Sequence, residues 1–220
     1  MTDSTEIVEL PKTEIQLLSE HIAAKRSDKI LSQILHGDEL TIAVKRDLLV
    51  ETIKFLRDDK KCAFNQLMDI TAVDYPQNAE RFEIVYHLLS LSKNHRIRVK
   101  TTTDEEVPID TITDLYPTAN WFEREVWDMY GVFFAGHPDP RRILTDYGFE
   151  GHPLRKDFPL TGFVELRYDQ QQKRCVYEPV KLTQDFRAFD FLSPWEGMTD
   201  VQLPGDEKAV KPKFMPEGKK

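Results

Sequence analysis

Glycine and proline are distributed very unevenly along this chain of 220 residues. The first 116 residues contain one glycine and three prolines, whereas the remaining 104 contain eight glycines and ten prolines. Because both residues interrupt helices and strands, regular elements should dominate the first part. We therefore predict three parts: an α+β globular domain over residues 1–116, a helix plus turn-rich segment packed on it over 117–160, and an extended arm with a mobile tail over 161–220.

Two stretches of the first part show the hydrophobic spacing of amphipathic helices. One helix is predicted over residues 14–24, and the other begins at Arg46 or Asp47. In both, apolar side chains recur every three or four positions, so one face of each helix should be buried. The residues of these two faces are Ile15, Leu18 and Ile22, and Leu49, Ile53 and Leu56.

Alternating hydrophobicity predicts strands over residues 40–44 and 64–75, and a hairpin that turns at residues 92–94. In the return strand of this hairpin, basic residues alternate with apolar ones from Arg96 to Lys100, so one face should be dry and the other wet. The basic side chains also predict that this strand forms an edge of the sheet, where charge prevents stray pairing. Helices followed by a meander of strands predict an α+β fold, with helices packed on a mainly antiparallel sheet.

Residues 121–160 hold nine of the chain's aromatic residues, seven acidic and five basic residues, and two copies of the tripeptide Gly-His-Pro. The segment is too apolar for a disordered linker and too often interrupted for one long helix or strand. We predict a helix over residues 121–130 that Gly131 ends, then turns and short pieces, and a small hairpin over residues 168–179. Aromatic residues interleaved with arginine are enriched at protein interfaces. The segment is therefore predicted to be an active site or a docking surface.

Potential metal ligands are concentrated in this segment. Two histidines and three aspartates offer the donor types that bind zinc or iron. However, each histidine stands between glycine and proline, a pattern that fixes a turn and lets the imidazole hydrogen-bond to the backbone. A structural role is therefore favoured over a metal site. The residues concerned are His137, Asp139, Asp146, His152 and Asp157.

The charged side chains of the segment allow two further kinds of chemistry. Glu123, Glu125 or Asp128 could act as a general base if its pKa were raised, but ion pairs with Arg141 or Arg142 are the favoured interpretation. The arginines could also bind a phosphate group. Neighbouring aspartates would compete for them, and the chain has no glycine-rich nucleotide-binding loop, so a nucleotide site is disfavoured.

Other classes of function have little support. Cys62 and Cys175 are too few to hold an iron–sulfur cluster or a structural zinc ion through cysteines alone, and they are expected in the core and in a solvated loop. The net charge of −8 disfavours nucleic acid as a partner. No run approaches the ~18 consecutive apolar residues of a membrane span. The acidic N-terminus resembles neither a secretory signal nor a transit peptide, which favours a bacterial or organelle-encoded chain, or a mature form.

The run Glu-Arg-Glu-Val-Trp-Asp-Met-Tyr-Gly at residues 123–131 resembles the signature of the 30-kDa subunit of respiratory complex I, the bacterial form of which is a proton-translocating NADH:quinone oxidoreductase. The continuation from Gly136 to Leu160, with both Gly-His-Pro copies, resembles the same family. The resemblance is dense over residues 80–197, including Phe-Asp-Phe and Ser-Pro-Trp-Glu in the last part, and weaker over residues 1–80.

This resemblance implies a non-redox subunit of the peripheral arm, on the cytoplasmic side of the bacterial inner membrane or the matrix side in an organelle. FMN and iron–sulfur clusters are then expected in other subunits. The expected partners are the 49-kDa-like subunit near the quinone site and the cluster-bearing subunits, with membrane contact only through the complex. The arm after Thr161 should wrap a partner. Interface or structural ion pairs are expected at Glu123, Arg124, Glu125, Asp128, Arg141, Arg142, Asp146, His152, Arg155 and Asp157.

Two alternatives remain open at this stage. One is the equivalent subunit of a related membrane-bound hydrogenase or of a plastid-type dehydrogenase that accepts electrons from ferredoxin. The other is an independent small metalloenzyme that uses His137 and His152.

Overall fold

A computed structural model describes residues 13–184 of the chain, except Asp38. These residues form two compact units, and the boundary lies between Phe163 and Val164. The part of the predicted arm from residue 185 onward, including the tail that begins at Lys208, lies outside the described residues.

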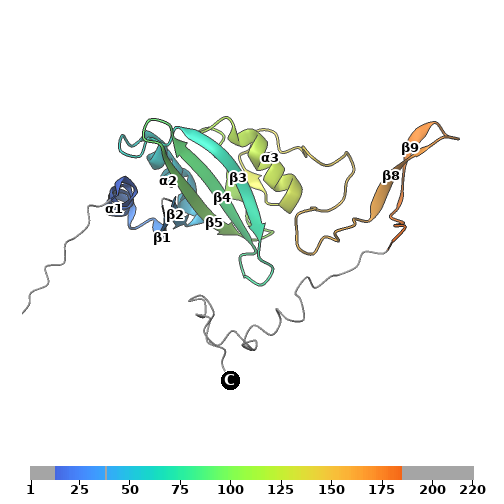
Figure 1. Ribbon diagram of the computed structural model, residues 1–220, viewed down its shortest axis with the longest axis horizontal. Helices are drawn as coiled ribbons and strands as arrows, with labels where there is room; N and C mark the ends of the chain where they lie inside the picture. The colour runs from blue at the N-terminus through green and yellow to red at the C-terminus, as the bar shows by residue number, and fades with distance from the viewer. Residues whose placement is uncertain (1–12, 38, 185–220) are drawn as a thin grey trace, which may run out of the picture. The chain divides into compact units, whose positions relative to one another are not determined.

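The first unit is built on a mixed five-stranded sheet with the strand order β1-β2-β5-β4-β3 (Figure 1). Three of its four strand pairs are antiparallel, and only β2 and β5 run parallel. The prediction of an α+β fold with a mainly antiparallel sheet is thus confirmed. The strands are β1 (Ile30–His36), β2 (Glu39–Val44), β3 (Gln66–Asp74), β4 (Phe82–Ser90) and β5 (His95–Thr103).

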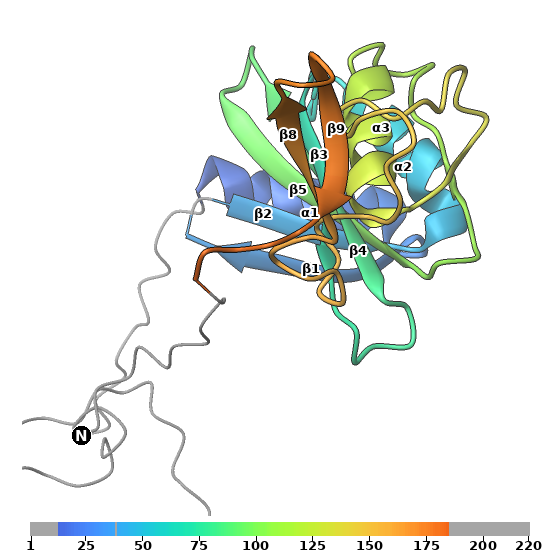
Figure 2. The same cartoon turned by 90° about the vertical axis from the view of Figure 1, so that its right-hand side faces the viewer.

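Three helices enclose the core against this sheet. They are α1 (Glu14–Arg26), α2 (Leu49–Asp58), which follows a short 3-10 turn, and α3 (Ala119–Tyr130). Figures 1 and 2 show α2 and α3 on the same face of the sheet. All six side chains predicted to line the first two helices are buried in one cluster that also contains Val126 of α3. The helical spacing read from the sequence therefore identified the core face correctly.

The predicted hairpin is formed by β4 and β5, but the position predicted for its return strand was wrong. Strand β5 lies inside the sheet, between β2 and β4, and not at an edge. Its basic side chains project from the face opposite the core, where Arg98 pairs with Glu39 at 3.0 Å and Lys100 pairs with Glu83 at 2.7 Å. The alternating basic residues therefore indicated a solvent-facing side of the sheet and not a sheet edge. On that side, both neighbouring strands supply acidic partners.

Strand β1 was not predicted. Its apolar residues Ile30, Leu31, Ile34 and Leu35 follow a spacing closer to that of a helix than to the alternation of a half-buried strand. Pairing with β2 nevertheless makes it a strand at one edge of the sheet. Leu31 and Ile34 remain about 60% exposed there.

Helix α3 begins two residues before its predicted start and ends where predicted. Gly131 adopts the left-handed conformation, with φ of 79°, and its N–H donates to the carbonyl of Trp127 at 2.8 Å. The chain then pairs β6 (Ile109–Asp110) with β7 (Phe134–Ala135) and continues without further regular structure to the end of the unit. Glycine thus ends the helix because a left-handed residue is required there.

The second unit contains the antiparallel hairpin of β8 (Val164–Asp169) and β9 (Arg174–Pro179), drawn in orange in Figure 2. The hairpin predicted over residues 168–179 is confirmed, although its first strand begins earlier, at Val164. Pairing starts there because Val164 lies opposite Pro179 in the register.

Replacing Gly131 by alanine should destabilise the first unit by about 2–4 kcal/mol, since the left-handed conformation disfavours a side chain and overpacking adds to the cost. A Cβ at this position would lie 2.7 Å from the ring of His152 and closer still to the guanidinium of Arg155. Gly148→Ala is the matched control, because Gly148 has φ of 80° but open space around it, so only about 1 kcal/mol is expected. Urea unfolding followed by tryptophan fluorescence measures both. Equal losses of unfolding free energy in the two variants would show that the contact of a Cβ with His152 and Arg155 has no cost.

Candidate functional site

The carboxylate of Asp128, in the last turn of α3, accepts five hydrogen bonds although its residue is fully buried. Three donors are the consecutive backbone N–H groups of residues 143–145, at 2.8–3.1 Å. The other two are the hydroxyl of Thr145 at 2.7 Å and Nη1 of Arg142 at 2.8 Å. We call Asp128, Arg142 and residues 143–145 the Asp128 cluster. It supplies the loop backbone with the partners that water would otherwise provide.

Asp128 is ionised at neutral pH. Burial alone would raise its pKa, but the hydrogen bonds from Thr145 and from the neighbouring N–H groups outweigh burial and hold the pKa well below its usual range. Arg142 supplies the opposite charge and also donates to the carbonyl of Gly151 at 3.0 Å. Its guanidinium lies over the ring of Trp127, 5.3 Å from the centroid. The ion pair is therefore shielded by an aromatic face.

Both histidines of the Gly-His-Pro copies are engaged with the backbone. His137 donates from Nε2 to the carbonyl of Asn120 at 3.0 Å, and its Nδ1 accepts from the N–H of Asp139 at 3.0 Å. His152 donates from Nδ1 to the carbonyl of Asp128 at 3.0 Å. Burial, as the main cause, lowers the pKa of His152, so its ring is neutral. The prediction that these imidazoles hydrogen-bond to the backbone is confirmed.

Arg124 attaches the same loop to the exposed side of α3. Its Nε and Nη2 donate to the carbonyls of Arg141 and Arg142 at 2.9 and 3.1 Å, and its guanidinium lies 5.3 Å from the ring centroid of Trp121. Within the described residues, the guanidinium thus meets carbonyl oxygens and an aromatic face where an ion pair was expected.

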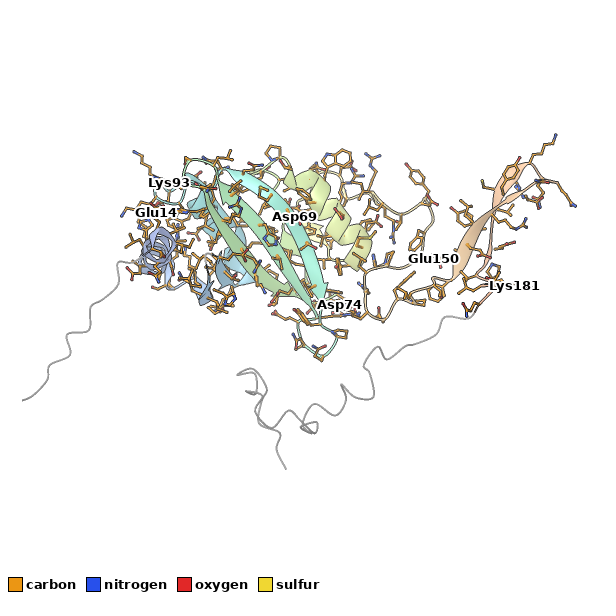
Figure 3. All side chains as sticks on the ribbon, in the orientation of Figure 1. Glu14, Asp69, Asp74, Lys93, Glu150 and Lys181 are labelled. Atoms are coloured by element: carbon orange, nitrogen blue, oxygen red, sulfur yellow. The ribbon has the colours of Figure 1, made fainter. Side chains whose placement is uncertain are left out.

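A second charged cluster lies at the end of β3, where Figure 3 labels Asp74. Arg81 donates to both carboxylate oxygens of Asp74, at 2.6 and 2.8 Å, and pairs with Glu105 at 2.8 Å and Asp157 at 3.0 Å. Arg155 also pairs with Glu105, at 3.2 Å. We call these five residues the Arg81 cluster. It joins the turn-rich segment to the sheet.

Glu123 behaves differently from the other acidic residues of α3. Its carboxyl group is buried against neutral donors: it hydrogen-bonds to the hydroxyl of Thr111 and accepts from the N–H of Ile112 at 2.9 Å. Burial raises its pKa to about 7, and these hydrogen bonds offset only part of that effect. The ion pair expected for Glu123 is not formed among the described residues, because its side chain faces the core.

The remaining predicted site residues lie on the surface. Glu125 and Asp146 are exposed, and Arg141 pairs with Asp139 at 2.7 Å while 71% of its side chain stays accessible. The structure therefore divides the predicted set into a buried cluster around Asp128, a cluster around Arg81, the isolated Glu123, and a surface group.

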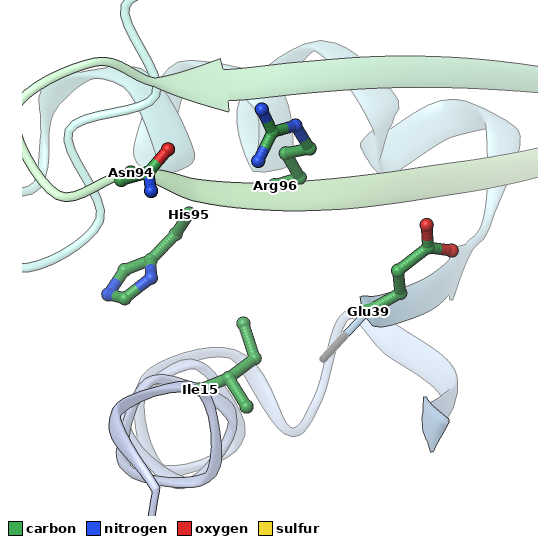
Figure 4. Close-up of a pocket in the computed structure, with 5 residues that line it drawn as sticks. All are labelled: Ile15, Glu39, Asn94, His95 and Arg96. Carbon is green, nitrogen blue, oxygen red and sulfur yellow. The ribbon is translucent and has the colours of Figure 1, made fainter. Parts of the chain in front are cut away.

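The histidines and aspartates weighed as a metal site are not brought together. Among the residues that the structure describes, only His21, Asp59 and Cys62 place metal-binding atoms close enough to share an ion. A hollow of about 440 Å³ lies elsewhere in the first unit, lined by Ile15, Glu39, Asn94, His95 and Arg96 (Figure 4). It holds acidic and basic groups together, so it favours neither an anion nor a cation.

The family with the description "Respiratory-chain NADH dehydrogenase, 30 Kd subunit" matches residues 42–164, more than half of the chain. The NADH-quinone oxidoreductase C subunit of Caulobacter vibrioides is 60% identical over 195 residues, which cover 89% of this chain and 98% of the relative. This chain belongs to the 30-kDa complex I subunit family.

Other similarities agree with this assignment. The NADH-quinone oxidoreductase C subunit of a Methylobacterium strain is 55% identical over 214 residues, covering 95% of this chain and 99% of that one. A chain in the solved structure of the membrane-bound sulfane sulfur reductase, an archaeal respiratory membrane complex, is 29% identical. That similarity has a TM-score of 0.58 and covers 66% of this chain and 85% of the other. The fold therefore occurs in more than one kind of respiratory complex.

None of the helices within the described residues has the length and hydrophobicity needed to span a bilayer.

Sequence reasoning missed three members of the Arg81 cluster: Asp74, Arg81 and Glu105. A signal for two of them was present, since Asp74 and Arg81 flank the turn at residues 76–78 that joins two predicted strands. An acid and a base on either side of a tight turn can pair. Glu105 gave no comparable signal, because its place depends on how β5 and the loop after Gly151 meet in space.

Replacing Asp128 by asparagine should cost about 3–5 kcal/mol, as expected when a buried ion pair loses one partner. The NH₂ group of asparagine is itself a donor, and it would face N–H and O–H donors that now point at the carboxylate of Asp128. Asp139→Asn is the matched control, because Asp139 pairs with an arginine of the same loop at the surface, where such pairs contribute little. Urea unfolding at neutral pH measures both. Similar midpoints for the two variants would contradict the central place given to Asp128.

Glu123 should make stability fall as pH rises. Its pKa is raised on folding from the ordinary 4.5 to about 7, so its contribution is fully present below pH 4.5 and is lost as pH approaches 7, by roughly 3 kcal/mol. Glu123→Gln should abolish this decline, whereas Glu125→Gln, on the exposed side of the same helix, should keep it. The test is urea unfolding between pH 4 and 8. Parallel pH curves for the two variants would show that folding does not raise the pKa of Glu123.

Proposed function

We propose that this chain is a non-redox structural subunit of the peripheral arm of proton-translocating NADH:quinone oxidoreductase. In this proposal it docks on the 49-kDa-like subunit near the quinone site and contacts the cluster-bearing subunits. Electrons pass from NADH to quinone through FMN and iron–sulfur clusters held by those other subunits. The complex lies on the cytoplasmic side of the bacterial inner membrane, or the matrix side in an organelle, and this chain touches the membrane only through it.

The apolar face of the β8–β9 hairpin carries this proposal. In the observed register, Val164 faces Pro179, Leu166 faces Tyr177, and Tyr168 faces Cys175. Successive side chains of a strand point to opposite faces, so these six residues share one face of the ribbon. The other face is charged and includes the ion pair of Arg167 and Glu178 at 2.9 Å. The hairpin is thus amphipathic across its thickness.

This apolar face is accessible within the second unit. Val164, Leu166, Tyr168 and Tyr177 are each at least half exposed. An isolated two-stranded hairpin is only marginally stable in water and needs a third strand or another cover. A partner protein that buries the face would stabilise the hairpin and gain an anchor rich in aromatic residues. This supports the expectation that the chain after Thr161 wraps a partner.

Helix α3 and the loop that follows it offer a second set of exposed apolar side chains. Trp121 and Leu144 are 62% exposed, and Tyr147 is fully exposed. Leu144 belongs to the Asp128 cluster, and its N–H donates to the carboxylate at 2.8 Å. Exposed aromatic residues on a helix, and on a loop that hydrogen bonds hold to that helix, suit a preorganised docking surface, because little further ordering is needed on binding.

The equivalent subunit of a related membrane-bound hydrogenase or of a ferredoxin-accepting dehydrogenase would dock through the same surfaces. The balance of similarity favours the quinone oxidoreductase, since a relative with that name is 60% identical and the sulfane sulfur reductase chain is 29% identical.

Leu166→Lys should lower the amount of assembled complex several-fold without changing NADH:quinone turnover per assembled complex, since it places a charge in the proposed interface. The control is Leu31→Lys. Both leucines lie on strands, and they are 55% and 60% exposed, so the substitutions are matched in type and accessibility. The variants are expressed in place of the native protein, and complex recovered from gently solubilised membranes is quantified by mass spectrometry and activity.

A normal amount of complex with slow turnover in Leu166→Lys would contradict a purely structural role. Recovery of the wild-type chain alone, as a free monomer, would overturn the proposed function as a whole.

A further inference from the structure

Three metal-binding side chains converge where the N-terminal helix meets the end of α2. Nε2 of His21 lies 3.1 Å from Oδ1 of Asp59, and the ligand atoms of His21, Asp59 and Cys62 all lie within 4.8 Å of one another. The side chains of His21 and Asp59 are 14% and 10% exposed, and Cys62 is fully buried. The group is therefore largely shielded from solvent, with its small accessible fraction on His21 and Asp59.

The backbone holds two of these ligands in a short turn. Asp59 and Cys62 are three residues apart, which is a spacing that zinc sites commonly use. The carbonyl of Asp59 accepts from the N–H groups of Cys62 and Ala63 at 3.1 and 2.7 Å, and Ala63 adopts a left-handed φ of 50°. The N–H of Lys61 donates to the carboxylate at 2.8 Å. A backbone donor of this kind orients a ligand in the manner of an outer-shell contact.

His21 completes the group from a different element. Its ring stacks on Phe55, with centroids 6.5 Å apart, so the imidazole direction is fixed by packing. The carboxylate of Asp59 already binds one cation, because the ammonium group of Lys25 lies 2.8 Å from its Oδ2 atom. Lys25 is 52% exposed, so it can move into solvent without breaking the core.

We propose that His21, Asp59 and Cys62 form a binding site for a divalent zinc ion. One imidazole, one carboxylate and one thiolate are ligand types that zinc accepts, with a fourth tetrahedral position left for water. On binding, the thiol proton of Cys62 and the proton between Nε2 of His21 and Asp59 are released to solvent. The imidazole then coordinates through Nε2 and carries a proton only on Nδ1. Lys25 is displaced because a second cation at the same carboxylate is unfavourable.

Two other interpretations fit less well. Nucleophilic catalysis is disfavoured because Cys62 is fully buried and burial raises the pKa of its thiol to about 12. A coordinated divalent ion, by contrast, would itself remove the thiol proton. A purely structural ion pair accounts for His21, Lys25 and Asp59. It gives the Cys62 thiol only a hydrogen bond to the same carboxylate, so it predicts no metal–thiolate signal.

Cobalt titration of the full-length chain tests the proposal, because a cobalt–thiolate bond gives a charge-transfer absorption that carboxylate and imidazole ligands do not. The wild type and Cys175→Ser should bind one cobalt ion with this absorption, and zinc should displace it. Cys62→Ser should lose the absorption. His21→Gln, which changes a residue outside the core, should weaken binding at least about tenfold while its circular dichroism stays unchanged.

Lys25→Gln adds a readout that an ion-pair role would not give. Removing the competing ammonium should tighten cobalt binding several-fold. The proposal is overturned if the wild type shows no thiolate absorption, if the absorption survives Cys62→Ser, or if Lys25→Gln leaves affinity unchanged or weaker.

Discussion

The convergence of loop donors on the buried carboxylate of Asp128 is the interaction on which the arrangement of residues 131–160 depends. A segment with so many glycines and prolines cannot satisfy its own backbone through helix or sheet hydrogen bonds. Instead, one carboxylate on helix α3 accepts hydrogen bonds from three consecutive N–H groups, a hydroxyl and an arginine. An irregular loop is thereby given a definite path across the end of a regular element.

The Arg81 cluster performs a related task at the other end of the same segment. There the fixed element is a strand and the central group is a guanidinium, which gathers three carboxylates. The N–H of Lys156 adds a backbone contact to Asp74 at 2.7 Å. The turn-rich segment is therefore held at two points by opposite charges. Both points lie on elements that the hydrophobic core has already positioned.

Much of the fold could be predicted because its elements bury regular apolar patterns. The stripes of α1 and α2, the β4–β5 hairpin and the glycine that ends α3 were all readable in this way. Strand β1 was not, since its residues imitate helical spacing, and the central position of β5 was not, since sheet order is set by partners distant in sequence. In the candidate site, too, features set by neighbouring residues could be predicted, whereas features set by the tertiary structure could not. The roles of His137 and His152 could be read from flanking residues, whereas the raised pKa of Glu123 depends on which side of α3 faces the core.

The amphipathic β8–β9 ribbon has a consequence for the life of the chain before it meets its partners. An accessible apolar strand surface is a site of self-association. Copies synthesised in excess of their partners would therefore cluster through this ribbon or be recognised as orphan proteins. In the proposed function, the supply of this chain would therefore have to match the supply of the surface that covers the ribbon. The same six side chains would serve both assembly and the recognition of unassembled copies.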